Sequence, residues 1–274
     1  MVGKLAMLGA AALLAVTGIA ATGAGGEERA SPEGRIYHYI RSNRDGSMPE
    51  HIHVYRAAAG RLEVYKMVER CTGAALVTAW IDPTTGQASR MTGGRLMPEA
   101  RHEDFATLLW NAGARRIDAH VVTGDGVIEE QIAVADTPWH LYDFDLASLS
   151  VQTMGRADPR ADFRFGLPLA WNEPNETHPF LSNLGRADAH FVREEQYQGR
   201  PALRFEVGGP ALGQRGGPLW IDAEHGHVLG AEWGVPNHAP MTDFALRLVH
   251  TDDGGAAAWT ALLTRHFEGC PSEG

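Results

Sequence analysis

Apolar and polar residues alternate along much of the chain with a period of two. The run Arg61–Glu69 alternates cleanly, and the runs Ala202–Val207 and Phe244–Leu248 keep the same rhythm. A period of two is typical of strands that bury one face. Turn signals separate such runs, for example Gly-Asp-Gly at 124–126, where glycine supplies the positive φ of a tight hairpin. The pattern predicts a mainly β protein built from antiparallel strands.

Helical periodicity is confined to two stretches. Between Pro98 and Gly113, apolar residues recur at the i, i+3, i+4 and i+7 positions of a helix, with proline suited to the first turn and glycine to the exit. A shorter candidate begins at Asp145 as the N-cap and runs to about Met154. The neighbouring acid, Asp143, is then expected to belong to the same capping region.

One local sequence occurs twice. Trp-Ile-Asp at 80–82 and again at 220–222 is followed by three turn residues and a glycine, Gly86 or Gly226. In each copy we expect the aspartate carboxylate to cap the turn and the glycine to take a left-handed conformation. Either the same hairpin solution has arisen twice, or residues 75–92 and 215–233 are related by internal duplication.

Successive strands carry apolar side chains on one face, and that face must be covered. A single sheet can hide it by curling, or by packing against a second sheet or a helix. The sequence therefore predicts a curved antiparallel sheet or half-open β-barrel with one or two short helices. A hairpin at 252–255 is expected to lead into a last strand, Trp259–Phe267. The concave side should be lined by apolar residues from these faces: Phe205, Ile221, Trp233 and Leu246.

The first thirty residues have the composition of an export signal. Lys4 precedes an apolar run of about a dozen residues, and small residues follow it. This run is shorter than the roughly 20 residues that span a bilayer. We therefore expect a signal peptide at 1–24, a flexible lead-in at 25–34 and a single β domain at 35–274. The mature protein should have no transmembrane segment and should be periplasmic or secreted.

Cys71 and Cys270 are the two cysteines of the chain. In an exported protein an even pair predicts one disulfide, because the compartment is oxidising. The formal charge of −10 argues against a protein that binds nucleic acid by neutralising phosphates.

Residues suited to catalysis or metal binding form no clear motif. The sequence contains no Gly-x-Ser-x-Gly elbow and no phosphate-binding glycine loop before a helix. Among the thirteen histidines, His51 and His53 have a spacing that can deliver two imidazoles to one metal ion, and His225 and His227 repeat it. No third ligand accompanies either pair, so we expect no metal, no cofactor and no catalytic residue. A hydrolase or lyase that uses these histidines, with or without metal, is the alternative.

The second half of the chain has a recognisable order of elements. An apolar strand at Ala202–Val207 precedes Leu-Trp-Ile-Asp at 219–222, a turn with Gly226 and a further strand. In this order the segment 190–250 resembles the periplasmic lipoprotein-carrier fold, the Lol-type unclosed β-barrel, and its uncharacterised exported relatives. The stretch Asp143–Leu149 is similar to one in those relatives. The resemblance implies an exported protein whose concave sheet shelters acyl or other apolar groups.

These features together predict a non-enzymatic, exported, soluble β-protein. Its expected partner is an apolar small molecule, a lipid or a component of the cell envelope. A structural or interaction module of the envelope is a further reading of the same features, in which the interior is filled and a protein partner binds outside.

Overall fold

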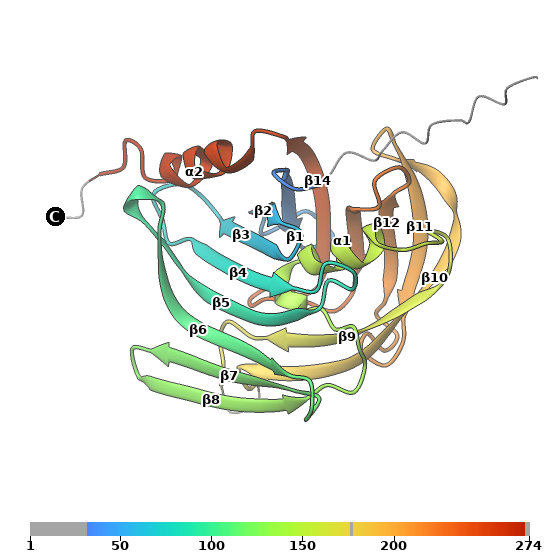
Figure 1. Ribbon diagram of the computed structural model, residues 1–274, viewed down its shortest axis with the longest axis horizontal. Helices are drawn as coiled ribbons and strands as arrows, with labels where there is room; N and C mark the ends of the chain where they lie inside the picture. Colours follow the sequence, from blue (N-terminus) through green and yellow to red (C-terminus); the bar gives the residue numbers. More distant parts are fainter. Residues whose placement is uncertain (1–31, 176–177, 272–274) are drawn as a thin grey trace, which may run out of the picture. The chain divides into compact units, whose positions relative to one another are not determined.

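Every strand in the described residues, 32–175 and 178–271 of the computed structural model, belongs to one antiparallel sheet (Figure 1). Each strand pairs with its neighbour in sequence, so that the sheet consists of two meanders joined where β1 pairs with β14. The first meander contains β1 (Ile36–Ser42), β2 (Glu50–Ala58), β3 (Arg61–Met67), β4 (Ala75–Ile81), β5 (Ala88–Met97), β6 (Arg101–Asn111), β7 (Arg116–Thr123) and β8 (Gly126–Ala133). The second contains β9 (Phe163–Ala170), β10 (Leu181–Tyr197), β11 (Arg200–Gly208), β12 (Gly217–Asp222), β13 (Val228–Trp233) and β14 (Phe244–Asp252).

The two end strands of this sheet, β8 and β9, are joined by no backbone ladder in the described part of the chain. Side chains connect β8 to the start of β10, the strand next to β9, instead. The Glu130 carboxylate accepts hydrogen bonds from the backbone N–H groups of Phe180 and Leu181, at 3.2 and 2.6 Å. Asn183 Nδ2 donates to the carbonyl of Ala133 at 2.8 Å. The sheet therefore curls without closing into a barrel, and the prediction of a mainly β, half-open antiparallel sheet is confirmed.

The connection from β8 to β9 covers the concave, inner face of the sheet. We call residues 134–155 the covering segment; it includes a 3₁₀ turn, η2 (Tyr142–Phe144), and the helix α1 (Ala147–Met154) (Figure 1). Its apolar side chains belong to the same buried cluster as those of the inner face of the sheet. They are Val134, Trp139, Leu141, Tyr142, Phe144, Leu146, Ala147, Leu149 and Val151. The main core of the protein thus lies between this segment and the sheet.

Both Trp-Ile-Asp turns have the conformation expected from their sequence. Asp82 Oδ1 accepts the N–H groups two and three residues ahead of it, at 2.8 and 2.9 Å, and Asp222 Oδ1 does the same at 3.0 and 2.7 Å. Gly86 and Gly226 have φ values of 72° and 77°. Both glycines lie directly against the covering segment: a Cβ atom on Gly86 would be 2.2 Å from the carbonyl oxygen of Ser148. The two hairpins therefore hold α1 between them.

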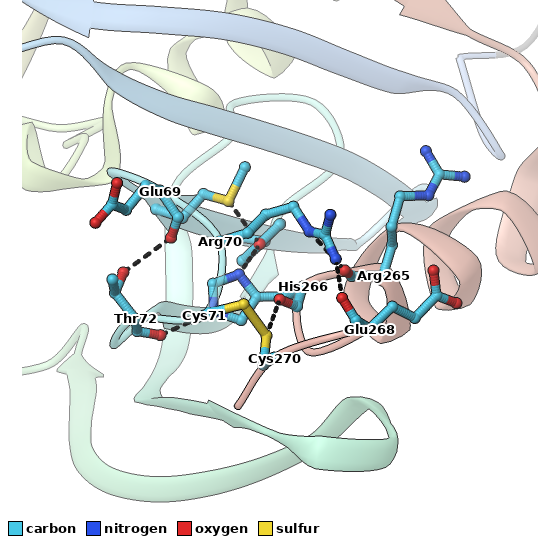
Figure 2. The surroundings of a disulfide bond; sticks show 10 residues. Glu69, Arg70, Cys71, Thr72, Arg265, His266, Glu268 and Cys270 are labelled. Atoms are coloured by element: carbon cyan, nitrogen blue, oxygen red, sulfur yellow. Dashed lines mark hydrogen bonds between the residues drawn. A yellow bond between two sulfur atoms is a disulfide. The ribbon is translucent and has the colours of Figure 1, made fainter. Parts of the chain in front are cut away.

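The opposite, outer face of the first strands is covered by the helix α2 (Gly255–Arg265). A second buried cluster joins Trp259 and Leu263 of α2 to side chains of β1–β4. Just beyond the helix, Cys270 forms a disulfide with Cys71, with a Cα–Cα distance of 5.4 Å, as predicted (Figure 2). Backbone and side-chain hydrogen bonds between residues 70–72 and 265–268 surround the bond (Figure 2).

Two predicted elements are wrong. The stretch predicted as a helix between Pro98 and Gly113 contains a 3₁₀ turn, η1 (Pro98–Ala100), and then β6, because its backbone pairs with strands on both sides. The predicted last strand, Trp259–Phe267, is mostly α2. Its alanine-rich start, together with an apolar stripe that packs on the sheet, outweighs the turn signal before it.

The remaining sequence predictions concern the short helix, the N-terminal signal and membrane-spanning helices. The short helix expected at 145–154 is present as α1, although Asp145 does not cap it. The predicted signal peptide at 1–24 and most of the lead-in at 25–34 lie outside the described residues. Within the described residues, no helix is long and apolar enough to span a bilayer.

Candidate functional site

Three charged side chains of the sheet point to one end of its inner face. Arg41, Glu50 and Lys66 come from β1, β2 and β3, and each occupies a position that alternation assigns to the buried face. Arg41 and Glu50 are direct cross-strand partners and form an ion pair. Arg41 is fully buried and Lys66 is 5% exposed. Charges at such positions are costly unless they are paired, so the partners of these two cations define the site.

The covering segment supplies those partners. The Asp145 carboxylate lies 3.2 Å from Arg41 Nη1 and 2.7 Å from Lys66 Nζ. The Asp143 carboxylate lies 3.6 Å from Arg41 and 3.5 Å from Lys66, whose ammonium also donates to the Asp143 carbonyl. We call these five residues, Arg41, Glu50, Lys66, Asp143 and Asp145, the ion cluster. It joins the middle of the covering segment to the inner face of the sheet.

A loop of the second meander completes the cluster. Asn237, which lies between β13 and β14, donates from Nδ2 to Asp145 Oδ1 at 2.9 Å and to the carbonyl of Tyr142 at 3.0 Å. The Tyr142 hydroxyl in turn donates to the carbonyl of Val235 at 2.7 Å. The ion cluster is therefore contacted from both meanders and from the segment between them.

The backbone at this point takes an unusual conformation. Asp145 and Leu146 are consecutive residues with φ values of 50° and 59°, in the left-handed region that residues with a Cβ avoid. Each such residue costs of order 1 kcal/mol or more and persists only where its surroundings hold it. Here the ion pairs fix the Asp145 side chain, and complete burial in the core fixes Leu146.

The two acids of the covering segment titrate differently. Burial alone would raise the pKa of Asp145, but Arg41, Lys66 and Asn237 hold that pKa below its ordinary value. For Asp143, burial outweighs the attraction of Lys66 and Arg41 and raises the pKa to about 6. Burial tends to lower the pKa of Lys66, and the two aspartates more than compensate. The lysine is thus a fixed cation, unsuited to act as a nucleophile.

All four predicted lining residues face the core. Phe205, Ile221, Trp233 and Leu246 have at most 2% exposure and belong to the cluster that includes the covering segment. The ring of Trp233 lies 5.5 Å from that of Tyr142. The inner face is thus apolar as expected, and side chains of the covering segment pack against it.

The first predicted histidine pair, His51 and His53, belongs to a larger row of imidazoles. On the outer face, His250, His38 and His53 are direct cross-strand neighbours on β14, β1 and β2. The Nδ1 atoms of His38 and His53 lie 2.8 Å apart, so one ring donates a hydrogen bond to the other. His51 stacks beside His53 with 6.2 Å between ring centroids.

In the second predicted pair, His225 is hydrogen-bonded and His227 is buried. His225 contacts Asp222, whereas His227 is 2% exposed and packs against Tyr37. Within the described residues, no three His, Cys, Asp or Glu side chains converge as metal ligands.

A hollow on the surface lies away from the ion cluster, over β6, β7 and β8. Its lining includes Asp118, His120 and Glu129, and the Nδ1 atom of His120 is 3.2 Å from Glu129 Oε1. Its lining mixes charged and polar side chains with apolar ones such as Leu109 and Ala119.

Sequence reasoning missed the ion cluster. It assigned Asp143 and Asp145 to a helix cap, and it gave Arg41 and Lys66 no role. A signal was present nonetheless. Arg41 continues the alternating buried positions of Tyr37 and Tyr39 in β1, and Lys66 also occupies a buried position, in β3. A cation at a buried strand position indicates that an acidic side chain from another part of the chain must pair with it.

Comparison with known proteins adds no family or activity. The sequence matches no protein-family model and no curated protein.

Proposed function

We propose that this protein is an exported, non-enzymatic carrier that binds an apolar, acyl-type ligand on the inner face of its sheet. The covering segment packs on that face, and we propose that it withdraws when the ligand binds. The strands supply a continuous apolar surface that includes Phe205, Ile221, Trp233 and Leu246. Desolvation of such a surface contributes about 25 cal/mol per Å² buried.

One observation carries the proposal. The backbone–backbone hydrogen bonds of residues 141–155 stay within the covering segment, so that part of the segment adds no strand to the sheet. It can leave the inner face without breaking a ladder. Side chains hold it there: the ion cluster at one end, and Ser150 and Thr153 of α1 at the other.

Two further features support export and a ligand-carrying role. A disulfide between Cys71 and Cys270 suits an oxidising compartment. The order of elements between residues 190 and 250 resembles that of the periplasmic lipoprotein carriers, whose concave sheet shelters acyl groups.

Mass spectrometry and hydrogen exchange together test the proposal. Protein purified from the exported fraction should release lipid on organic extraction and, once delipidated, should bind the methyl ester of 11-(dansylamino)undecanoic acid. Binding should increase hydrogen exchange in residues 141–155 and leave strands β11–β14 protected. No bound lipid and no binding of either the ester or its parent acid would overturn the proposal, and so would binding that leaves exchange in the covering segment unchanged.

A further inference from the structure

The charges of the ion cluster are divided unequally between the sheet and the covering segment. The sheet provides both cations, Arg41 and Lys66, and one acid, Glu50. The covering segment provides the other two acids, Asp143 and Asp145. With the segment in place, three acids face two cations.

Withdrawal of the covering segment changes this balance. It leaves Arg41 and Lys66 on the inner face with Glu50 as their remaining acidic partner in the cluster. Removing the partner of a buried charge is strongly unfavourable, because the low-dielectric surroundings do not replace the lost interaction. A neutral ligand that displaces the segment leaves this cost in place. A ligand that brings its own negative charge offsets it with charge-assisted hydrogen bonds.

We infer that the ligand is an anionic amphiphile, with a carboxylate or phosphate head that binds Arg41 and Lys66 and an apolar chain that lies along the inner face. This inference rests on the proposed function. The covering segment already presents the same chemistry within the chain. Its acids Asp143 and Asp145 alternate with Tyr142, Phe144 and Leu146, whose apolar side chains are buried against the sheet. The segment thus occupies the site as an internal substitute for the ligand.

The location of the two cations fits the head of such a ligand. Asp143 keeps 24% of its side chain exposed, so the cluster lies near solvent at one end of the buried face. Trp233, which contacts Tyr142 of the covering segment, continues the apolar surface away from it. A chain bound along this face therefore has its charged end at the ion cluster.

A matched pair of probes tests the inference. The acid form of 11-(dansylamino)undecanoic acid and its methyl ester share the chain and the fluorophore and differ in charge. At pH 7.5 the wild-type protein should bind the acid at least about ten-fold more tightly than the ester, measured by fluorescence titration.

Variants show which residue makes the protein bind the acid more tightly than the ester. Lys66→Gln should reduce the ratio of ester to acid Kd to near one, while the ester still binds. Arg247→Gln, which removes the same charge from the outer face of β14, should leave the ratio unchanged. The wild-type ratio decides the question even if Lys66→Gln fails to fold.

The outcomes separate the two proposals. Equal binding of acid and ester, or tighter binding of the ester, would overturn the anionic head and leave the carrier function standing. Failure of both probes to bind would overturn the carrier function itself. A ratio that Arg247→Gln lowers as much as Lys66→Gln does would show a general charge effect and would also overturn the inference.

Discussion

Asp143 and Asp145 are two residues apart and face the same two cations, yet their environments shift the two pKa values in opposite directions. Asp145 has no exposed side-chain surface and receives a hydrogen bond from Asn237 in addition to its ion pairs. Asp143 has longer contacts, 3.5 and 3.6 Å, and is the excess acid of the cluster. The folded state therefore binds the Asp145 anion strongly and tolerates a neutral Asp143.

This difference predicts different effects of two conservative substitutions. At pH 7.5, Asp145→Asn should lower the free energy of unfolding by about 3–5 kcal/mol, because it leaves buried Arg41 and Lys66 short of a partner. Asp143→Asn should leave it unchanged or raise it, because burial disfavours the Asp143 anion that is present at this pH and the amide removes that charge. Urea unfolding of both variants measures the two values. A loss from Asp143→Asn as large as that from Asp145→Asn would contradict the assignment.

The close contact between Gly86 and the covering segment gives a second prediction. Gly86→Ala should cost roughly 3 kcal/mol or more, because its Cβ atom would meet the carbonyl oxygen of Ser148 at 2.2 Å and its φ is positive. Gly46→Ala is the matched control: its φ is +83° and nothing lies within 4 Å of the added atom. The control should cost only about 1 kcal/mol, from backbone strain alone. Thermal unfolding of both proteins would show equal losses if the contact did not exist.

At the scale of elements, the inner and outer faces of the sheet are covered in different ways. Residues 141–155 of the covering segment are held on the inner face by side-chain contacts, at the ion cluster and at Ser150 and Thr153. On the outer face, α2 is held by Trp259, whose Nε1 atom donates to Glu63 at 2.6 Å, by Leu263, and by the adjacent disulfide. We therefore expect α2 to stay in place under conditions that release the covering segment.

The disulfide should stabilise the protein by restricting its unfolded state. It closes a loop with a sequence separation of 199 residues, for which loop entropy gives up to about 5 kcal/mol. The double variant Cys71→Ser/Cys270→Ser should lose a large part of this stability while its far-UV circular dichroism stays native. Hydrogen exchange should still show α2 protected, because Trp259 and Leu263 remain packed on the sheet. Loss of protection throughout α2 would show that the disulfide, not packing, holds the helix.

At the scale of the whole molecule, several histidines are held neutral within the fold. Burial is the main cause: it lowers the pKa of His53 to about 3 and the pKa of four others to about 4. The nearby imidazoles of His250 and His38 add to the effect on the outer-face row. The four histidines whose pKa falls to about 4 are His38, His140, His227 and His238.

These shifts predict an acid-sensitive protein. An unfolded histidine takes up a proton near pH 6.5, whereas the folded state resists protonation until about pH 4, so stability present above pH 6.5 is lost as the pH falls through this range. Asp143 acts in the opposite direction, because its raised pKa favours the folded state at lower pH, but it is one group against five. The melting temperature should therefore fall between pH 6.5 and 4. His53→Phe should weaken the pH dependence of the melting temperature, and His120→Ala, at an exposed position, should not alter it. A melting temperature that stays constant between pH 6.5 and 4 would contradict these pKa shifts.

Local sequence patterns predicted strands such as β3, β11 and β14, both Trp-Ile-Asp turns and the open antiparallel sheet. These features depend on interactions within a few residues: a period of two assigns the faces of a strand, and Asp82 and Asp222 cap turns a few residues long. The disulfide also followed from the sequence, because the chain offers only one pair of cysteines.

Conformations that depend on distant partners followed instead from how the elements pack. The residues of β6 carry a helical pattern, and pairing with β5 and β7 overrides it; α2 is a helix because an apolar surface of the sheet is available to it. The ion cluster joins Arg41 to Asp145, which are 104 residues apart in the chain. Local patterns show that a buried cation needs a partner, but the identity of that partner follows from how the two meanders and the segment between them pack together.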